Sequence, residues 1–456
     1  MQSISYGGRL TRAIVPAALM SLMACSGITD TLLEATDPDI INPAGVNSIE
    51  GARGLHVGTI SRLTAITAGN ESTWLFGGLL GDEWATSSTF VQNDETDQRR
   101  IQENNSQITN MLYRLYRTRT SANQAIAALN EWEPTATDRI AESYFARGFV
   151  DLQLASDFCN GIPLSDGAGE TITYGAPQTV AQVFASAIAA FDSAITLTNG
   201  STVAATIAIG RAARVGKARA QVGLNQIDAA ATTVAGIQTS FAYQSTFSLT
   251  SQTNTIWGQG LSSLRYTVGD SVQGNQRNIL VANAIPFASL NDPRVPVTKR
   301  TSAGQDGQTV MNVTQIYQQL TPVDIVNGLD ARLIEAEKAL RDNNVTQFLA
   351  ILNALRAAPP VIHSVTVAPM AALTDPGTAE GRVNLFFREK ALWTFSRGQR
   401  LGDMRRLIRQ YGRSANTVFP VGPHFKGGDF GPDLNLPIVT NERNNPNFQG
   451  CLDRNA

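Results

Sequence analysis

The chain has 456 residues, with 36 basic and 38 acidic side chains, so its formal net charge is −2 at pH 7. This balance, without any Lys/Arg-rich run, excludes the electrostatic footprint of a nucleic-acid-binding protein. Hydrophobic residues make up 43% of the chain and charged residues 16%, which predicts a large buried core and excludes an intrinsically disordered protein.

The first 24 residues have the pattern of an export signal. Arg9 and Arg12 precede an apolar run over residues 13–24, and Cys25 follows directly after the small residue Ala24. This placement predicts a lipoprotein signal peptide over 1–24, with Cys25 lipidated and residues 25–46 forming the anchor and linker. A cleaved secretory signal with Cys25 there by chance is the alternative. The run is too short to span a bilayer, and we expect no later stretch to do so.

Helical periodicity then dominates the chain from residue 47 onward. Apolar residues recur at helical spacing from Val180 to Ile195, and Thr179 with Gln182 forms a capping-box pattern in front of them. Residues 140–152 make a similar apolar face, in which Gly148 predicts a close approach of a neighbouring helix. The Ala-rich segments 211–224 and 227–237 predict a helical hairpin, of about the size of a tetratricopeptide unit but without the Trp and Pro signature of that repeat.

The C-terminal half returns to helix. Residues 329–340 carry an apolar stripe, and a long helical pattern runs from about 379 to 410 with Gly398 as the expected break. Beyond Tyr411 the chain is rich in Gly, Pro and Asn, so we expect its last 45 or so residues to be irregular and to lie over the helical body.

Cys159 and Cys451 are the cysteines that remain after Cys25. An oxidising compartment permits a disulfide between them, and two separate thiols are the alternative, because a sequence does not show whether the two Cα atoms approach each other. The three histidines lie far apart in the sequence and have no Cys or carboxylate partner at ligand spacing, so we predict no metal and no cofactor.

Two segments do not fit a plain stack of helices. Residues 241–321 form a loop-rich insertion with few charges in its first forty residues, and residues 81–97 set aromatic rings among amides, hydroxyls and carboxylates. Such a mixture suits a carbohydrate, whose C–H faces stack on aromatic rings while its hydroxyls exchange hydrogen bonds with amides and acids. Core anchoring is the alternative for each ring, and we favour it for Trp132 and Trp393. The candidate ligand-binding residues are Trp74, Trp84, Phe90, Asn93, Asp94, Trp257 and Tyr266.

The charges between residues 386 and 407 are of both signs, and we expect them to form structural ion pairs that tie this helical region to the C-terminal irregular segment.

The sequence gives little support for a catalytic role. Glycoside hydrolysis needs two carboxylates about 5–10 Å apart around the scissile bond, whereas Asp82 with Glu83 and Glu335 with Glu337 are adjacent or nearly adjacent in sequence. No nucleophile elbow, P-loop or dinucleotide fingerprint occurs. We therefore predict that the protein is not an enzyme.

The run FFREKALWTFSRGQRLGDMRRL at 386–407, followed by LPIVTNERNNPN at 436–447, resembles the C-terminal signature of the SusD/RagB family of surface glycan-binding lipoproteins. The segment 141–164 is similar to that family's tyrosine-rich helix and loop, with Cys159-Asn160 where a Gly-Asp pair is more usual. ARLIEAEKAL, the NALR of 353–356 and the NDPR of 291–294 also fit. The resemblance covers essentially the whole mature chain and is weakest in the middle, where sugar contacts would lie.

The resemblance implies an all-α fold, a tetratricopeptide-like helical-hairpin superhelix over 47–456 with long irregular insertions and an irregular C-terminal segment. It also implies an outer-membrane, lipid-anchored, surface-exposed protein that binds an oligosaccharide or similar nutrient. Its partner would be a TonB-dependent, SusC-like transporter, over which it acts as a lid. The alternatives are a helical-repeat scaffold lipoprotein that binds envelope proteins and a secreted carbohydrate-active enzyme. The sequence contains no motif that shows whether the ligand is a glycan or a peptide.

Overall fold

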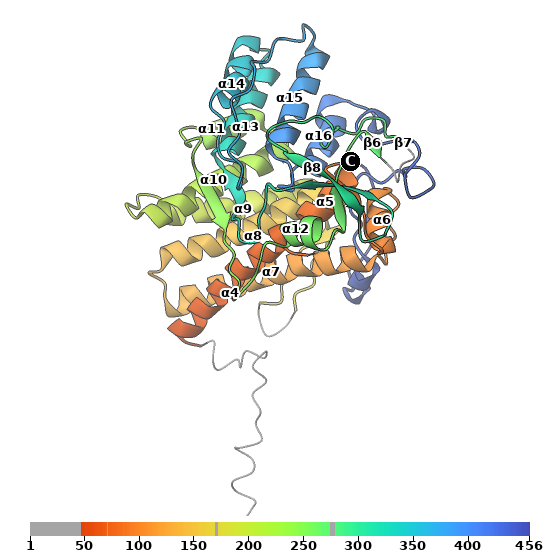
Figure 1. Cartoon of the computed structure of the whole chain (residues 1–456). Coiled ribbons are helices and arrows are strands. Elements are labelled where there is room, and N and C mark those ends of the chain that lie inside the picture. Colours follow the sequence, from red (N-terminus) through yellow and green to blue (C-terminus); the bar gives the residue numbers. More distant parts are fainter. Residues whose placement is uncertain (1–46, 71, 169–171, 274–278) are drawn as a thin grey trace, which may run out of the picture.

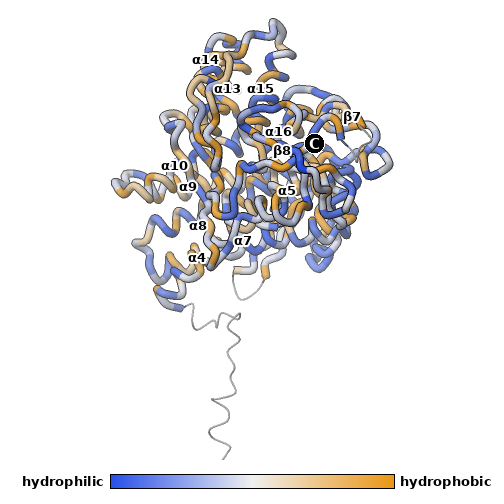
Figure 2. Tube along the Cα trace, viewed as in Figure 1, coloured by the Kyte–Doolittle hydropathy of each residue, from blue (hydrophilic) through white to orange (hydrophobic). Residues whose placement is uncertain are grey.

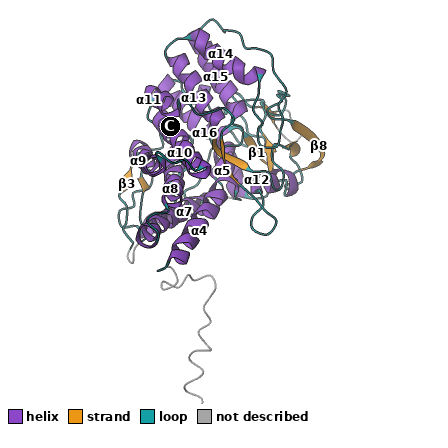
Figure 3. Cartoon of the chain, turned by 90° about the vertical axis from the view of Figure 1, so that its left-hand side faces the viewer, coloured by secondary structure: helices purple, strands orange, loops and turns teal. Residues whose placement is uncertain are grey.

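The structure is a computed structural model that describes residues 47–70, 72–168, 172–273 and 279–456. The predicted signal peptide, Cys25 and the linker up to residue 46 lie outside the described residues. In the described part, helices form most of the molecule. Several short strands and loops, β1 (Trp84–Thr86) and β8 (Val297–Ala303) among them, lie on one side of it, whereas β3 (Pro177–Gln178) lies on the other (Figure 1; Figure 3).

Antiparallel helical hairpins make the first half of the body. Successive helices pack on one another, from α4 through α7 to α11, and Figure 2 shows polar and apolar residues alternating along them. Their bounds are α4 Ile49–Ala68, α7 Ser106–Trp132, α8 Thr137–Asp157, α9 Val180–Thr198, α10 Ala204–Gly223 and α11 Ile227–Val234. The predicted helix from residue 180 and the hairpin at 211–237 are confirmed.

Local signals explain where these helices begin and how closely they pack. Thr179 and Gln182 form the predicted capping box at the start of α9. Gly148 lets α8 and α9 approach, since a Cβ there would lie 2.9 Å from the ring of Phe191. By length and composition α9 could span a membrane, contrary to our expectation for the later chain, but its apolar face is buried against α8 and α10.

The second half adds two more helical pairs above the first (Figure 1). These are α13 Gly328–Arg341 with α14 Val345–Ala357, and α15 Ala379–Trp393 with α16 Arg400–Tyr411. The predicted break between α15 and α16 is present, and Gly398 there has a φ of +63°. A side chain at this position would collide with the ring of Trp74, at 2.1 Å from its Cβ, so both the turn and the packing require glycine.

The segment that the sequence marked as loop-rich contains short strands as well as loops. It holds β4 Ala242–Ser245, β5 Tyr266–Val268, β6 Val272–Gln273, β7 Ile279–Leu280, β8 Val297–Ala303 and β9 Val310–Thr314, with the short helix α12 Thr255–Trp257 and the π-turn 258–262. The remaining strands are β1 Trp84–Thr86, β2 Ile162–Pro163, β3 Pro177–Gln178 and β10 Val323–Asn327. All pair antiparallel in two-stranded ribbons: β1 with β5, β2 with β3, β4 with β10, β6 with β7 and β8 with β9.

The C-terminal segment is irregular, as predicted, apart from two short 3₁₀ turns at 415–417 and 440–444. It returns across the end of α8, where the backbone N–H of Cys159 donates to the carbonyl of Leu436 at 3.0 Å. Cys159 and Cys451 form a disulfide, with their Cα atoms 5.7 Å apart. The sequence left open whether these cysteines form a disulfide or remain two separate thiols, and the structure contains the disulfide.

Candidate functional site

The two segments that the sequence singled out lie side by side in the structure. Strand β1, from the 81–97 segment, pairs with β5 from the loop-rich segment, with Ala85 opposite Thr267. Thr267 then links β5 to β9, because its hydroxyl oxygen accepts the backbone N–H of Asn312 at 2.8 Å. Three pieces of chain that are far apart in the sequence thus form one small β surface.

A hollow of about 550 Å³ lies over this surface. Ala85 and Thr267 contribute to its floor, and Phe425 from the C-terminal segment closes part of it. Its volume falls in the range typical of small-molecule sites. The other polar and charged side chains that line it are Asp270, Gln273, Ser289, Asn291, Lys299, Thr309 and Asn312.

Several of these polar groups are left without a protein partner. The Gln273 side-chain oxygen is buried and accepts no hydrogen bond from any described residue, and its amide nitrogen donates to the carbonyl of Asp270 at 3.1 Å. Within the described ranges, the Lys299 ammonium makes no ion pair and the Asn312 side-chain amide makes no hydrogen bond. A hydroxyl-bearing ligand would supply these groups with the donors and acceptors that they lack.

Asp270 is the carboxylate among the lining residues of the hollow, and it is held in place. One of its oxygens accepts from the backbone N–H of Ser271 at 2.7 Å and from the hydroxyl of Ser289 at 2.8 Å. The two acidic pairs that the sequence offered as catalytic candidates do not line the hollow. Asp82 of the first pair binds Arg400, and Glu337 of the second binds Arg406. The described residues that line the hollow therefore offer hydrogen-bonding groups, one positive charge and one negative charge, and they include no facing pair of carboxylates.

Three of the predicted aromatic residues are buried in the core. Trp74, Trp84 and Tyr266 have 0%, 3% and 3% of their surface exposed, so their rings offer no face to a ligand. Trp84 packs against Phe395 with ring centroids 5.3 Å apart. On paired strands, side chains alternate between two faces, and the rings of Trp84 and Tyr266 take the core face while their neighbours Ala85 and Thr267 line the hollow. We do not retain these three rings as stacking residues.

The predicted polar site residues Asn93 and Asp94 do not line the hollow and have protein partners instead. The Asn93 amide donates to the Tyr266 hydroxyl at 3.1 Å, and Asp94 accepts from Thr86 and from Lys426, each at 2.8 Å. Burial raises the pKa of Asp94, against the effect of Lys426. These contacts fasten helix α6, Val91–Asp97, to β1 and to the C-terminal segment.

Phe90 and Trp257 keep some exposure. Phe90 is 41% exposed, but the guanidinium of Arg265 lies 4.2 Å from its ring centroid and covers one face. Trp257 is partly buried against the core. Neither lines the hollow.

Two other tryptophans, Trp132 and Trp393, were assigned to the core. Trp393 is fully buried, but Trp132, at the end of α7, is 37% exposed, so that assignment is wrong for Trp132.

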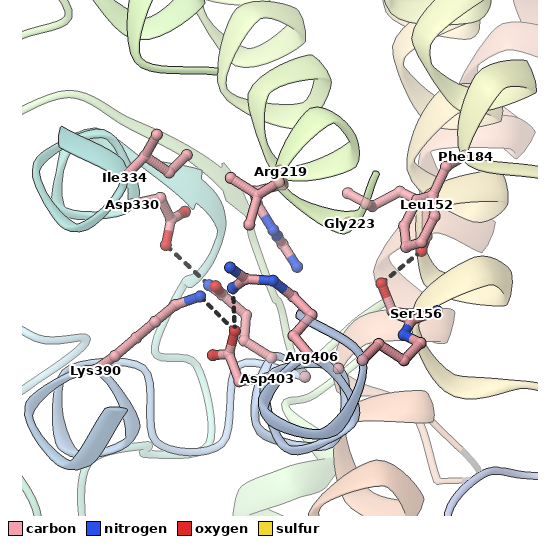
Figure 4. Close-up of a pocket in the computed structure, with 15 residues that line it drawn as sticks. Leu152, Ser156, Phe184, Arg219, Gly223, Asp330, Ile334, Lys390, Asp403 and Arg406 are labelled. Atoms are coloured by element: carbon pink, nitrogen blue, oxygen red, sulfur yellow. Dashed lines mark hydrogen bonds and ion pairs between the residues drawn. The ribbon is translucent and has the colours of Figure 1, made fainter. Parts of the chain in front are cut away.

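Several charged residues of the 386–407 motif form a separate, buried cluster, of which Figure 4 shows Lys390, Asp403 and Arg406 beside Asp330 and Arg219. Lys390 donates to Asp403 at 2.7 Å, and Arg406 bridges Asp403 and Glu337. Arg397 binds Asp330 through both of its terminal nitrogens, at 3.0 and 2.9 Å. Burial tends to raise the pKa of Asp330, but the nearby Arg397 and Arg219 outweigh it and leave the pKa below its ordinary value.

Structural ion pairing in this region is what the sequence predicted, but the predicted partner segment is wrong. Asp330 and Glu337 belong to α13, and Asp82 follows α5 (Thr73–Gly81), so these pairs join α16 and the turn before it to α13 and α5 instead of to the C-terminal segment. The small cavity among these side chains is about 50 Å³, too small for an oligosaccharide. We therefore regard the cluster as part of the scaffold.

Comparison with solved structures identifies the fold. A SusD superfamily protein from Bacteroides fragilis aligns with a TM-score of 0.65 at 16% identity, covering 88% of this chain and 99% of that chain. A SusD superfamily protein from Bacteroides vulgatus aligns with a TM-score of 0.61 at 16% identity, covering 88% and 98%. A SusD-like carbohydrate-binding protein, also from Bacteroides vulgatus, aligns with a TM-score of 0.62 at 14% identity, covering 88% and 97%.

No known family's sequence profile matches the chain, and no curated protein matches it by sequence. The likeness is therefore one of fold. The predicted mostly helical, SusD-like architecture is confirmed across nearly the whole described chain.

Proposed function

We propose that this protein is a surface-exposed outer-membrane lipoprotein that binds an oligosaccharide and delivers it to a TonB-dependent transporter. The observation that carries the binding part is the hollow over β1, β5 and β9, whose unpaired amide and ammonium groups suit a hydroxyl-rich ligand. The SusD-like fold supports the same function, since one solved structure of this fold is described as a carbohydrate-binding protein.

Recognition in this hollow would rest on hydrogen bonds more than on stacking. Asn312 and Gln273 each offer an amide group, Lys299 offers a donor, and Asp270 offers an acceptor. Valine side chains along the rim, such as Val272 and Val297, would contact the C–H faces of sugar rings. Affinity would come from several modest contacts, each worth about 0.5–1.5 kcal/mol.

A glycan array followed by isothermal titration calorimetry tests the binding. We expect a glycan to bind without release of new reducing ends, and we expect Asn312→Ala to raise its Kd about tenfold, because the variant removes one amide from the hollow without touching the core. The matched control is Asn416→Ala, an exposed asparagine in the C-terminal segment. Unchanged affinity in a folded Asn312→Ala protein would remove the hollow as the site, and release of reducing ends would favour the enzyme alternative.

The anchor and the transporter need separate tests. Cys25→Ala should leave the protein soluble and unanchored, and externally added protease should cleave the wild-type protein on intact cells. Affinity purification of the wild-type protein should recover a large outer-membrane barrel as its main partner. A shielded, periplasm-facing protein would contradict the lid role, and recovery of other envelope proteins alone would favour the scaffold alternative.

A further inference from the structure

A second recess lies between α4 and α7, apart from the hollow described above. The two helices pack side by side (Figure 1) and are joined by a hydrogen bond of 3.1 Å between the hydroxyls of Thr59 and Ser121. The groove between them has a volume of about 510 Å³ and shares no lining residue with the hollow over β1 and β5. Its size again falls in the range of small-molecule sites.

The α7 wall of this groove is a stripe of polar and aromatic side chains on one helical face. Its members fall at i, i+3, i+4, i+7, i+8 and i+11, and they are Tyr113, Tyr116, Arg117, Thr120, Ser121 and Gln124. A helix face that packs in a core carries apolar residues at this spacing, so a stripe of phenol, guanidinium and hydroxyl groups beside a groove is suited to a polar ligand.

The α4 wall leaves room for that ligand. Gly54 and Gly58 lie one turn apart on it, and a Cβ added to either would meet no atom within 4 Å. Neither position therefore needs glycine for helix packing. The missing side chains open the groove so that a ligand would contact the backbone of α4 directly.

Two positive charges at the groove have no counter-ion. Arg62 on α4 and Arg117 on α7 line it, are exposed, and make no ion pair or side-chain hydrogen bond with any described residue. Tyr116 is only partly buried, but its hydroxyl is fully buried and also has no partner in the described part of the chain. Glu442 stands at the edge, and burial raises its pKa.

These groups together define a ligand chemistry. Planar guanidinium groups bind carboxylates and phosphates with paired hydrogen bonds. Tyrosine rings offer faces to sugar C–H groups, while Gln124, Thr120 and Glu442 offer partners to sugar hydroxyls. We propose that the α4–α7 groove is a second binding site, which takes a small anionic saccharide of one or two rings bearing a carboxylate or a phosphate.

Titration calorimetry of the full-length protein at low ionic strength tests this site. The probes are digalacturonate, its uncharged methyl ester as the matched control, and glucose 6-phosphate. We expect at least one anionic probe to bind, the methyl ester to bind at least tenfold more weakly than digalacturonate, and binding to weaken as salt is added. The tighter of the two anionic probes identifies the preferred anion.

Variants assign the binding to the groove. Arg117→Gln should raise the Kd for the anionic probe at least tenfold, whereas Arg211→Gln, an exposed arginine on α10 with the same change in net charge, should leave it unaltered. Asn312→Ala, in the other site, should also leave it unaltered. Amide hydrogen exchange should slow over residues 54–62 and 113–124 when the probe is bound.

Three results would overturn the proposal. The first is that neither anionic probe binds the wild-type protein. The second is that the methyl ester binds as tightly as digalacturonate, and the third is that Arg117→Gln binds the anionic probe as tightly as the wild type does. Because the hollow is tested with neutral glycans and with Asn312, either site can fail while the other stands.

Discussion

Single residues in this protein illustrate how burial decides the role of an aromatic ring. Trp84 occurs in a segment whose composition suits sugar binding, yet its ring is 3% exposed and packs on Phe395. Phe90, six residues later, keeps an exposed ring because it lies at the start of α6 and not on a strand that faces the core. Composition drew attention to this segment, and the alternation of side chains along the strand placed the ring of Trp84 in the core and Ala85 at the hollow.

Trp84→Ala should therefore destabilise the fold before it affects any ligand contact. We expect a loss of about 3–5 kcal/mol in the free energy of unfolding, because the substitution leaves a large cavity beneath β1 and β5. Denaturant unfolding followed by circular dichroism measures it. Trp132→Ala is the control, since that ring is 37% exposed and should cost much less. Equal losses in the two variants would contradict the buried position of Trp84.

Glu83 predicts a pH dependence of stability. Burial raises the pKa of its carboxyl to about 8, against the opposing hydrogen bond from the backbone N–H of Ser396 at 3.0 Å. In the unfolded chain the carboxyl ionises near its ordinary pKa of about 4.3. The folded state thus holds a proton that the unfolded state releases, so this contribution to stability is complete below about pH 4 and declines as the pH rises toward about 8.

The test of Glu83 is the slope of stability against pH. Glu83→Gln keeps the shape and the hydrogen bond without the titration, so its free energy of unfolding should fall less between pH 5 and pH 8 than that of the wild type. Chemical denaturation at several pH values measures both curves. Glu380→Gln, an exposed residue of α15, is the control and should reproduce the wild-type slope. Parallel curves for Glu83→Gln and the wild type would show that Glu83 is ionised in the folded protein.

At the scale of elements, small residues set how closely helices approach. Gly148 on α8 and Gly216 on α10 both face the ring of Phe191 on α9, and an added Cβ would lie 2.9 and 2.5 Å from it. These contacts hold three successive helices at short distances. The helical spacing of apolar residues predicted α8 and α9, and the alanine-rich composition of 211–224 predicted α10. Gly148 predicted one close approach, but the partner ring became known only from the packing.

Gly148→Ala should destabilise the protein by about 1–3 kcal/mol, because the methyl group overpacks the contact between α8 and α9. Gly54→Ala on α4 is the matched control. Its added methyl group meets no atom within 4 Å, so the better helix propensity of alanine should stabilise the protein by up to about 1 kcal/mol. Thermal or denaturant unfolding of the two variants should shift in opposite directions. A shift in the same direction would contradict the packing of α8 on α9.

At the scale of the whole molecule, the C-terminal segment holds the two halves of the chain together. The disulfide joins Cys159 at the end of α8 to Cys451, 292 residues later. The Arg99 guanidinium also donates to the carbonyls of Asp433 and Pro420, at 2.9 and 2.6 Å. A cross-link over so long a stretch of chain restricts the unfolded state strongly.

Removal of that cross-link should lower the free energy of unfolding by about 2–5 kcal/mol. We expect Cys451→Ser to show this loss, and a reducing agent to lower the unfolding midpoint of the wild type but not of the variant. Mass spectrometry of the non-reduced, proteolysed protein should find the peptides of Cys159 and Cys451 linked. Two free thiols in the native protein would contradict the bond.

Local periodicity and single special residues were enough to predict α8 to α11, α13, the pair α15 and α16, the capping of α9, the break at Gly398 and the irregular C-terminal segment. The helices α4 and α7 were not predicted individually. The resemblance of its motifs also predicted the SusD-like fold, which the likeness to solved structures confirms. The packing was needed to learn which carboxylates pair with the arginines of 386–407, whether Cys159 and Cys451 are linked, and that Ala85, Thr267 and Asn312 line one hollow. Those outcomes depend on contacts between residues that are distant in the sequence, such as Asp330 with Arg397, 67 positions apart, and Cys159 with Cys451, 292 positions apart, or on the choice of strand face. Neither leaves a periodic signal in the sequence.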